Sequence, residues 1–282
     1  MRKIRVSLSV LLLACCAIIL RAQNDNLAPA APPASAVTAA ASPGQDPSAA
    51  KARAVLNAMI QALGGDRWLN MQNSYTEGRI AAFYQGKPTG ATIRYWAWHT
   101  PSADRLDLTE KKKDKRDWMQ IYTDRECWEI TFRGKKPMPK DQCEEAIRRR
   151  DHSIDSVVRV WMKDPGTILM YEGKSLAERH LADQVTLLND RNDAVTLQID
   201  ADTHLPLRRS FSWRDPVYRD KNEDVEEYDD YHNIDGLPTP FTISRFHNGD
   251  EIQQRFVFKA GYNQNLPPGM FDADQQAARF NK

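Results

Sequence analysis

The sequence is poor in cysteine, and it contains none of the short motifs that mark common catalytic or cofactor sites. Only four cysteines occur among its 282 residues. None lies in a C-x-x-C pair or accompanies an H-x-x-x-H pair, so no metal site is predicted. G-x-x-x-x-G-K-[ST], G-x-G-x-x-G and G-x-S-x-G are also absent, which argues against a nucleotide cofactor and a serine nucleophile. We therefore expect no cofactor, no catalytic residue and no enzymatic activity.

The chain also lacks an excess of charge of either sign. It carries 39 Lys and Arg against 38 Asp and Glu, whereas a nucleic-acid-binding protein concentrates basic residues on one face. No nucleic-acid partner is expected. A dense basic run, EKKKDKRD at residues 110–117, is most often a solvated hairpin tip. The alternative is contact with anionic lipid head groups or an acidic partner, so peripheral membrane contact stays open.

The long apolar run of the sequence lies at its N-terminus. MRKIR supplies positive charge, VSLSVLLLACCAIIL is an apolar run of 15 residues, and Ala22 is a small residue at a plausible cleavage point. The run is shorter than the roughly 20 residues of a transmembrane helix. Residues 1–22 are therefore predicted to be a secretory signal peptide and the mature protein to be periplasmic. The alternative is a lipid anchor at Cys15, because LLAC resembles a bacterial lipobox, but the apolar residues that follow favour the signal peptide.

Export also bears on the two cysteines that remain after cleavage. Cys127 and Cys143 would be the only thiols of the mature chain. In an oxidising compartment such a pair favours a disulfide over two free buried thiols.

Composition divides the rest of the chain into a tether and a folded part. Residues 23–48 are rich in Ala, Pro and Ser and contain no aromatic residue, so they cannot bury enough apolar surface to offset chain entropy. They are predicted to be a disordered tether. Residues 49–282 are predicted to form a single domain.

Apolar periodicity within that domain predicts a few helices and many strands. Val55, Leu56, Met59, Ile60 and Leu63 fall on one helical face that ends at the following Gly-Gly pair. The segment KDQCEEAIRRRDHSIDSVVRVWMKD is predicted to be helical, as one helix or as two pieces, with Glu144 and Arg148 paired on a solvated face. The remainder alternates like strands, which predicts an α+β fold with a large antiparallel sheet and a few helices on one side.

The stretch YDDYHNIDGLPTPFTISRFHNGDE, residues 228–251, contains four Asp and two His, so it could be a metal site or a pair of hairpins. On a regular strand Asp229 and His232 point to opposite faces. Asp235-Gly236 and Asn248-Gly249 are turn signals. A β-meander is therefore the favoured interpretation.

Three segments of the second half resemble the LolA-like proteins, which include the periplasmic carriers of outer membrane lipoproteins. They are LQIDADTHLPLRRSFSW, EEYDDYHNIDGLPTPFTISRFHNGDEIQQRFVF and NQNLPPGMFD. AMIQALGGDRWLNMQNSYTEGR resembles the N-terminal helix of the same family, so the resemblance extends from about Ala49 to Asp272. It implies an unclosed β-barrel, a strongly curved antiparallel sheet wrapped over helices, with an apolar cavity between them.

The function that this resemblance implies is binding or carriage of a lipid, a lipoprotein acyl chain or another apolar ligand by a monomer in the cell envelope. The alternatives are an envelope sensor or scaffold of the same fold that binds a protein partner, and an envelope enzyme with a polar cleft. Aromatic residues are the candidates for the cavity wall, although a packed core needs the same residue types. The candidate cavity residues are Trp96, Trp98, Phe83, Trp128 and Phe241.

Overall fold

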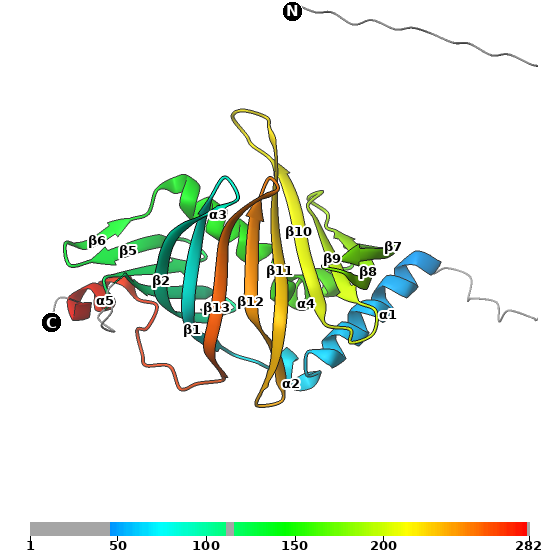
Figure 1. Ribbon diagram of the computed structural model, residues 1–282, viewed down its shortest axis with the longest axis horizontal. Coiled ribbons are helices and arrows are strands. Elements are labelled where there is room, and N and C mark those ends of the chain that lie inside the picture. Colours follow the sequence, from blue (N-terminus) through cyan, green and yellow to red (C-terminus); the bar gives the residue numbers. More distant parts are fainter. Residues whose placement is uncertain (1–45, 111–115, 281–282) are drawn as a thin grey trace, which may run out of the picture. The chain divides into compact units, whose positions relative to one another are not determined.

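Thirteen strands form one antiparallel sheet, and most of them follow one another in sequence order (Figure 1). The computed structural model describes residues 46–110 and 116–280. The predicted signal peptide, the alternative anchor at Cys15, the tether as far as residue 45 and residues 111–115 of the basic run lie outside the described residues. The strands are β1 (Ser74–Tyr84), β2 (Lys87–Thr100), β3 (Ala103–Thr109), β4 (Trp118–Thr123), β5 (Cys127–Thr131), β6 (Gly134–Pro137), β7 (Ile168–Ala177), β8 (His180–Leu188), β9 (Ala194–Asp200), β10 (Pro206–Arg214), β11 (Lys221–Ile234), β12 (Leu237–His247) and β13 (Asp250–Tyr262).

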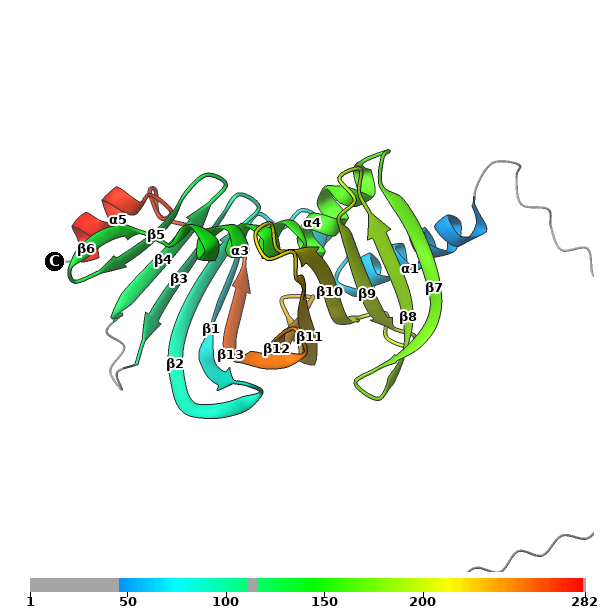
Figure 2. The same ribbon diagram turned by 90° about the horizontal axis from the view of Figure 1, so that it is seen from above.

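The sheet is open, and its edges are strands from the middle of the chain. The strand order is β6-β5-β4-β3-β2-β1-β13-β12-β11-β10-β9-β8-β7. The first and last strands therefore pair at its centre, whereas β6 and β7 lie at opposite edges. Figure 2 shows how strongly the sheet curves between these edges. The predicted α+β fold, an unclosed barrel made of one curved antiparallel sheet with a few helices, is confirmed.

The predicted β-meander of residues 228–251 is present as parts of β11, β12 and β13. Asp235 and Gly236 have φ values of 51° and 81°, and Asn248 and Gly249 have values of 52° and 87°. Two successive residues with positive φ are what a type I′ hairpin turn requires, and glycine adopts this conformation without steric cost. Within the described part of the chain, no group of three or more His, Cys, Asp or Glu side chains is placed to hold a metal ion.

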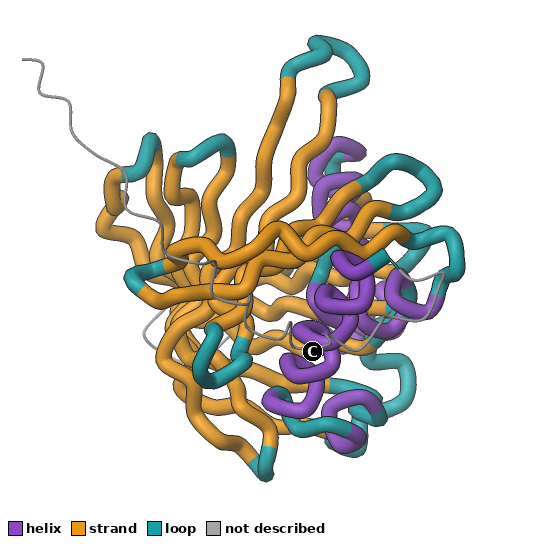
Figure 3. Tube along the Cα trace, turned by 90° about the vertical axis from the view of Figure 1, so that its right-hand side faces the viewer, coloured by secondary structure: helices purple, strands orange, loops and turns teal. Residues whose placement is uncertain are grey.

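The central helices reach the concave side of the sheet because the chain must travel from edge β6 to edge β7. Residues 138–167 make this crossing, and they carry the two predicted central helical pieces with them (Figures 2 and 3). No helix among the described residues is long and apolar enough to cross a membrane. The helices are α1 (Pro47–Ala62), α2 (Asp66–Leu69), α3 (Lys140–Asp151), α4 (Ile154–Arg159), the 3₁₀ helix η1 (Trp161–Lys163) and α5 (Ala273–Phe280).

Helix α1 begins two residues before the predicted start of the domain at residue 49. The Asp46 side chain accepts a hydrogen bond from the Ser48 backbone N–H at 2.9 Å. Pro47 follows the cap, where its missing N–H leaves no hydrogen bond unmade. The local capping sequence thus extends the helix into the segment that composition alone assigns to the tether.

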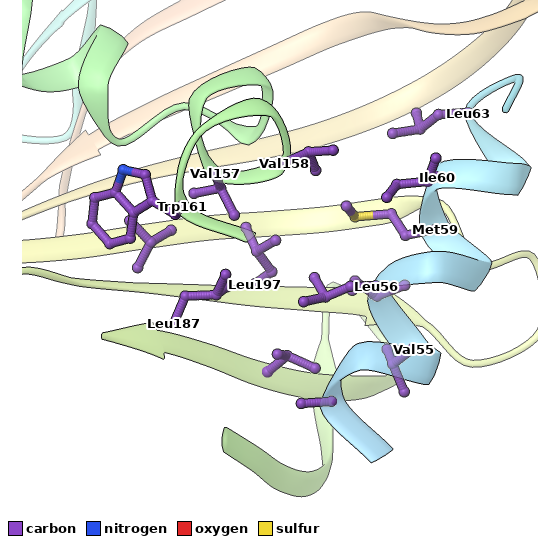
Figure 4. Close-up of a cluster of buried hydrophobic side chains, with 14 of the residues drawn as sticks. Val55, Leu56, Met59, Ile60, Leu63, Val157, Val158, Trp161, Leu187 and Leu197 are labelled. Atoms are coloured by element: carbon purple, nitrogen blue, oxygen red, sulfur yellow. The ribbon is translucent and has the colours of Figure 1, made fainter. Parts of the chain in front are cut away.

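One end of the concave face is a packed core. The five α1 residues predicted to share a face are all buried there, against α4, η1 and strands β7–β10 (Figure 4). Burial of each large apolar side chain contributes about 1.5–3 kcal/mol, so this cluster anchors α1 and α4 to the sheet. The other buried members are Ala52, Trp68, Val157, Val158, Trp161, Leu169, Val185, Leu187, Val195, Leu197, Ile199, Phe211 and Leu237.

The outer face of strands β1–β5 is covered as well, by the end of the chain. Met270 packs against Tyr75, Trp96 and Trp98. Helix α5, which the sequence interpretation omitted, then packs on β4 and β5 through Ala273, with Phe280 nearby. Both faces of this part of the sheet are therefore shielded from water, so apolar residues of these strands can lie on either face.

The predicted disulfide between Cys127 and Cys143 is present, and it ties β5 to the first turns of α3. Helix α3 has no fully buried residue. Its attachment to the sheet therefore depends on this bond and on polar contacts rather than on an apolar core.

Replacing both cysteines with serine is expected to lower the free energy of unfolding by about 3 kcal/mol, the entropic cost of opening a loop of roughly 15 residues. Because α3 lacks a buried face, its amide protons should lose protection from hydrogen exchange more than those of α1. Urea denaturation and hydrogen exchange measure the two effects. Thiol titration of the unreduced, denatured wild-type protein should find no free thiol, and a titre of two would contradict the disulfide.

Candidate ligand cavity

A cavity of about 540 Å³ lies between α3 and the concave face of strands β1–β4 and β11–β13. Its volume is within the range of about 300–1,000 Å³ that small-molecule sites occupy. The resemblance implied an apolar cavity, but of the 21 residues that line this one only six are aliphatic, and most of the others are charged or polar. The lining residues that matter below are Ser74, Ile80, Ile93, Ala97, Trp98, His99, Asp104, Leu106, Leu108, Tyr122, Arg149, Arg150, Glu226, Arg245 and Arg255.

The aliphatic wall comes from the inward-facing positions of β1, β2 and β3. Ile80 on β1 lies directly opposite Ile93 on β2. Leu106 and Leu108 alternate with the outward-facing residues of β3, and Leu108 packs with Ile80 and Tyr95. Residues directly opposite on adjacent antiparallel strands share a face, so these side chains form a continuous apolar surface on the cavity side of the sheet.

The charged wall comes from α3 and from β11–β13. Arg149 on α3 and Arg245 on β12 both bind the same oxygen of Glu145, at 2.5 Å and 2.6 Å. Burial and the neighbouring charge of Arg245 lower the pKa of Arg149. Burial alone would raise the pKa of Glu145, but the two arginines together lower it. The Glu145 carboxylate thus connects α3 to strand β12, because it binds Arg149 and Arg245 at the same time.

A second ion-pair network lies behind this wall. Asp224 is fully buried and binds Arg209 at 3.1 Å and Arg245 at 2.8 Å. Arg209 is itself only 1% exposed and also binds Glu226 at 3.1 Å. Burial alone would raise the pKa of Glu226, but the surrounding arginines lower it to about 2. Glu226 is therefore ionised at neutral pH, which suits a structural ion pair better than proton transfer.

The inner end of the cavity holds a histidine–aspartate pair. His99 Nδ1 lies 2.6 Å from Asp104. Burial would lower the pKa of His99, but the hydrogen bond and charge of Asp104 raise it overall. Ser74 lies directly opposite His99 in the β1–β2 register, yet among the described residues no hydrogen bond joins the two side chains. A serine nucleophile needs that contact with its base, so this arrangement is not an assembled catalytic triad.

The structure separates the predicted cavity residues from the cavity, with one partial exception. Trp98 is among the lining residues, but its ring packs 5.2 Å from that of Tyr75, in the cluster that the C-terminal segment covers. Ala97 also lines the cavity, and neighbouring strand residues point to opposite faces. The Trp98 ring therefore lies on the outer face, and Trp96 lies beside it.

The other three candidates also lie away from the lining. Trp128 packs under α5, with Lys135 4.1 Å from the centre of its ring. Phe241 contacts His232, with ring centres 4.3 Å apart. Phe83 is half-buried near the end of β1.

The residues that sequence interpretation missed are the arginines of the charged wall. The predicted pair of Glu144 with Arg148 is not formed. Glu144 pairs with Lys140, and Arg148 lies over the Trp213 ring. The pair that forms is one residue later, between Glu145 and Arg149, and its arginine lines the cavity. The i,i+4 spacing of both pairs is equal, so spacing alone cannot choose between them.

Comparisons with known proteins bear on the fold. No model of a protein family matches the sequence, and no curated protein matches it either. A DUF1329 family protein from Desulfovibrio piger is similar in structure, with a TM-score of 0.55 and 12% identity over 79% of this chain and 98% of that one. A domain assigned to the outer membrane lipoprotein-sorting proteins, from Vibrio parahaemolyticus, has a TM-score of 0.54 and 9% identity over 82% of this chain and 100% of that one.

A LolA superfamily protein from Nitrosomonas europaea aligns with a TM-score of 0.49 and 13% identity, over 79% of this chain and 98% of that one. The two matches above 0.5 agree with the open, curved sheet described above. The predicted resemblance therefore holds for the fold, which this chain shares with the lipoprotein-sorting domain from Vibrio parahaemolyticus and the DUF1329 family protein.

Proposed function

We propose that this protein binds a lipid, a lipoprotein acyl chain or a similar ligand in the cavity under α3, and that it carries or presents this ligand in the cell envelope without chemical change. The observation behind the proposal is the cavity of about 540 Å³ with its aliphatic wall. The similarity to a domain assigned to lipoprotein-sorting proteins supports it. Export by the signal peptide at residues 1–22, a tether that ends before α1 begins at Pro47 and a monomeric state are parts of the same proposal.

The size of the cavity suits a single acyl chain. A water molecule occupies about 30 Å³, and a methylene group is similar in size, so the cavity corresponds to roughly 18 non-hydrogen atoms. Transfer of an acyl chain out of water is worth about 0.8 kcal/mol per methylene group. A carrier must offer comparable shelter and must also release the chain. A lid such as α3, held by a disulfide and ion pairs rather than by an apolar core, could open without unfolding the domain.

Lipid bound to the protein tests this proposal directly. Mass spectrometry of the protein purified from its native envelope should find a co-purifying lipid, and the delipidated protein should take up a fluorescent fatty-acid probe. If the protein carries no lipid and takes up no probe, the carrier proposal fails. The alternative, a scaffold of the same fold that binds a protein partner, would then be the hypothesis to pursue.

A further inference from the structure

The charged wall of the cavity selects the charge of a ligand's head group, in addition to the shelter that the aliphatic wall offers an acyl chain. We propose that the ligand is a single-chain anionic amphiphile whose head group binds Arg255, between the aliphatic wall and the arginines of α3 and β12. This inference rests on the proposed function, because it names the class of ligand that the same cavity would bind. Its evidence is the arrangement of charges and apolar side chains around Arg255.

The first step is a comparison of cations with anions at this wall. Arg149, Arg209 and Arg245 bind three carboxylates between them. Arg255 lies on the same wall, but its guanidinium forms no ion pair or hydrogen bond with any described residue. Four guanidinium groups therefore face three carboxylates, Glu145, Asp224 and Glu226. Arg255 is near enough to Glu226 for its charge to lower the pKa of that carboxyl, but it makes no direct ion pair with it.

Arg150, the remaining arginine of the charged wall, has a different role. It binds Asp124 at 2.7 Å and lies 3.7 Å from Asp104. It also donates hydrogen bonds to the backbone carbonyls of Ser102 and Thr123. These contacts fix α3 to the β2–β3 and β4–β5 turns, so Arg150 is occupied in holding the lid and Arg255 is the cation available to a ligand.

The second step is the position of Arg255 relative to the apolar wall. Arg255 lies directly opposite Ile80 in the β1–β13 register, and Ile80 lies opposite Ile93 in the β1–β2 register. The three side chains therefore form one cross-strand row on the cavity face. Beyond Ile93 the surface passes diagonally to β3, where Leu108 lies opposite Tyr95 and Leu106 opposite Ala97. With strands about 4.8 Å apart, the distance from β13 to β3 is roughly 14 Å. A chain that leaves a head group at Arg255 would meet the apolar cluster of Ile80, Ile93 and Leu108, in which Tyr95 is also packed.

The third step is the chemistry of the cation. A guanidinium group is planar, always charged, and binds carboxylate or phosphate oxygens through two parallel hydrogen bonds. Half-buried at the border of an apolar wall, the guanidinium favours an anion over a neutral polar group, because a neutral head group would leave it without a direct ion pair. Arg149 and Arg245 add positive charge to the same wall, since they share a single carboxylate, Glu145.

The experiment compares ligands of one chain length and different head-group charge. The delipidated protein is titrated below the micelle concentration with hexadecanoate, hexadecanol and hexadecyltrimethylammonium, each in competition with the same fluorescent probe. Hexadecanoate should bind at least about tenfold more tightly than hexadecanol, equivalent to about 1.4 kcal/mol, and the cationic compound should bind least well. Palmitoyl lysophosphatidate is titrated in the same way. If it binds more tightly than hexadecanoate, the cavity prefers a phosphate head group, and if it binds less tightly, the cavity prefers a carboxylate.

Two variants locate the preference. Arg255→Gln should reduce the advantage of hexadecanoate over hexadecanol to less than about threefold, while the affinity for hexadecanol stays unchanged. Arg79→Gln is the matched control, because Arg79 is exposed and lies opposite Phe256, one register position away. It should leave both affinities unchanged. Equal binding of hexadecanol and hexadecanoate by the wild-type protein would overturn the head-group inference and leave the carrier proposal intact, whereas no binding of any amphiphile would overturn both.

Discussion

Asp224→Asn should lower the free energy of unfolding by about 3–5 kcal/mol. Asp224 has no exposed surface, and its carboxylate binds Arg209 and Arg245 at 2.8–3.1 Å. Removing one partner of a buried ion pair costs about 3–5 kcal/mol, because it leaves the opposite charge buried without compensation. Here two cations lose their shared carboxylate at once, and Arg209 is almost completely shielded from water. Urea denaturation of the purified variant measures the change.

The neighbouring residue supplies the control for this prediction. Glu223 precedes Asp224 on β11, is exposed and faces the other side of the sheet. Glu223→Gln removes the same charge and should change the free energy of unfolding by less than about 0.5 kcal/mol. A loss below about 1 kcal/mol for Asp224→Asn would mean that solvent or other groups compensate the two arginines, and the buried network would then not be a main support of the charged wall.

Most of the sheet could be predicted from the sequence, because alternation and turn residues are local signals. The turns at Asp235-Gly236 and Asn248-Gly249 are formed where they were predicted, and the α1 face is buried as its periodicity indicates. Strand β3 has a weak strand signal in the sequence for a physical reason. Its outward positions hold Arg105 and Asp107, which pair at 2.8 Å and are buried, so a buried strand reads as a polar segment.

The cavity was harder to predict than the fold, because alternation shows which residues share a face but not which face is inside. Trp96 and Trp98 do share a face. In an open barrel the outer face normally meets water, so aromatic residues on one face suggest the interior. Here the segment that contains Met270, together with α5, covers the outer face. Both faces of β2 are therefore apolar, and only the folded chain shows that Ile93 and Ala97 are the ones next to the cavity.

The arginines of the charged wall could not be predicted from the sequence either, because they lie far apart in the chain. Arg245 and Arg255 lie on β12 and β13, 19 and 29 residues after Glu226 on β11 in the chain, and the register of the sheet brings them together. Arg149 reaches them from a helix about a hundred residues earlier. Single charges in alternating strands are ordinary on a solvated face, so their convergence depends on long-range pairing that no local pattern encodes.

Ala97→Phe should abolish uptake of a fluorescent fatty-acid probe and leave the melting temperature nearly unchanged. Ala97 lies on β2 between Thr76 and Leu106 in the sheet register, and it lines the cavity. A bulky side chain added to a well-packed core costs about 1–3 kcal/mol. In a domain of this size that would lower the melting temperature by about 2–4 °C for each kcal/mol. An empty cavity accommodates the ring without that strain, and the ring then occupies the space that the acyl chain needs.

Ala91→Phe is the matched control, because Ala91 lies on the same strand at an even spacing from Ala97 but is exposed and outside the cavity. It should change neither uptake nor the melting temperature. Probe titration and thermal melts of both variants separate three cases. Lost uptake with an unchanged melt places the ligand beside Ala97. A lowered melt with retained uptake would show that the region around Ala97 is packed in solution and that the ligand binds elsewhere. Lost uptake in both variants would show that the added ring distorts strand β2, and that uptake is not lost because the ring fills the cavity.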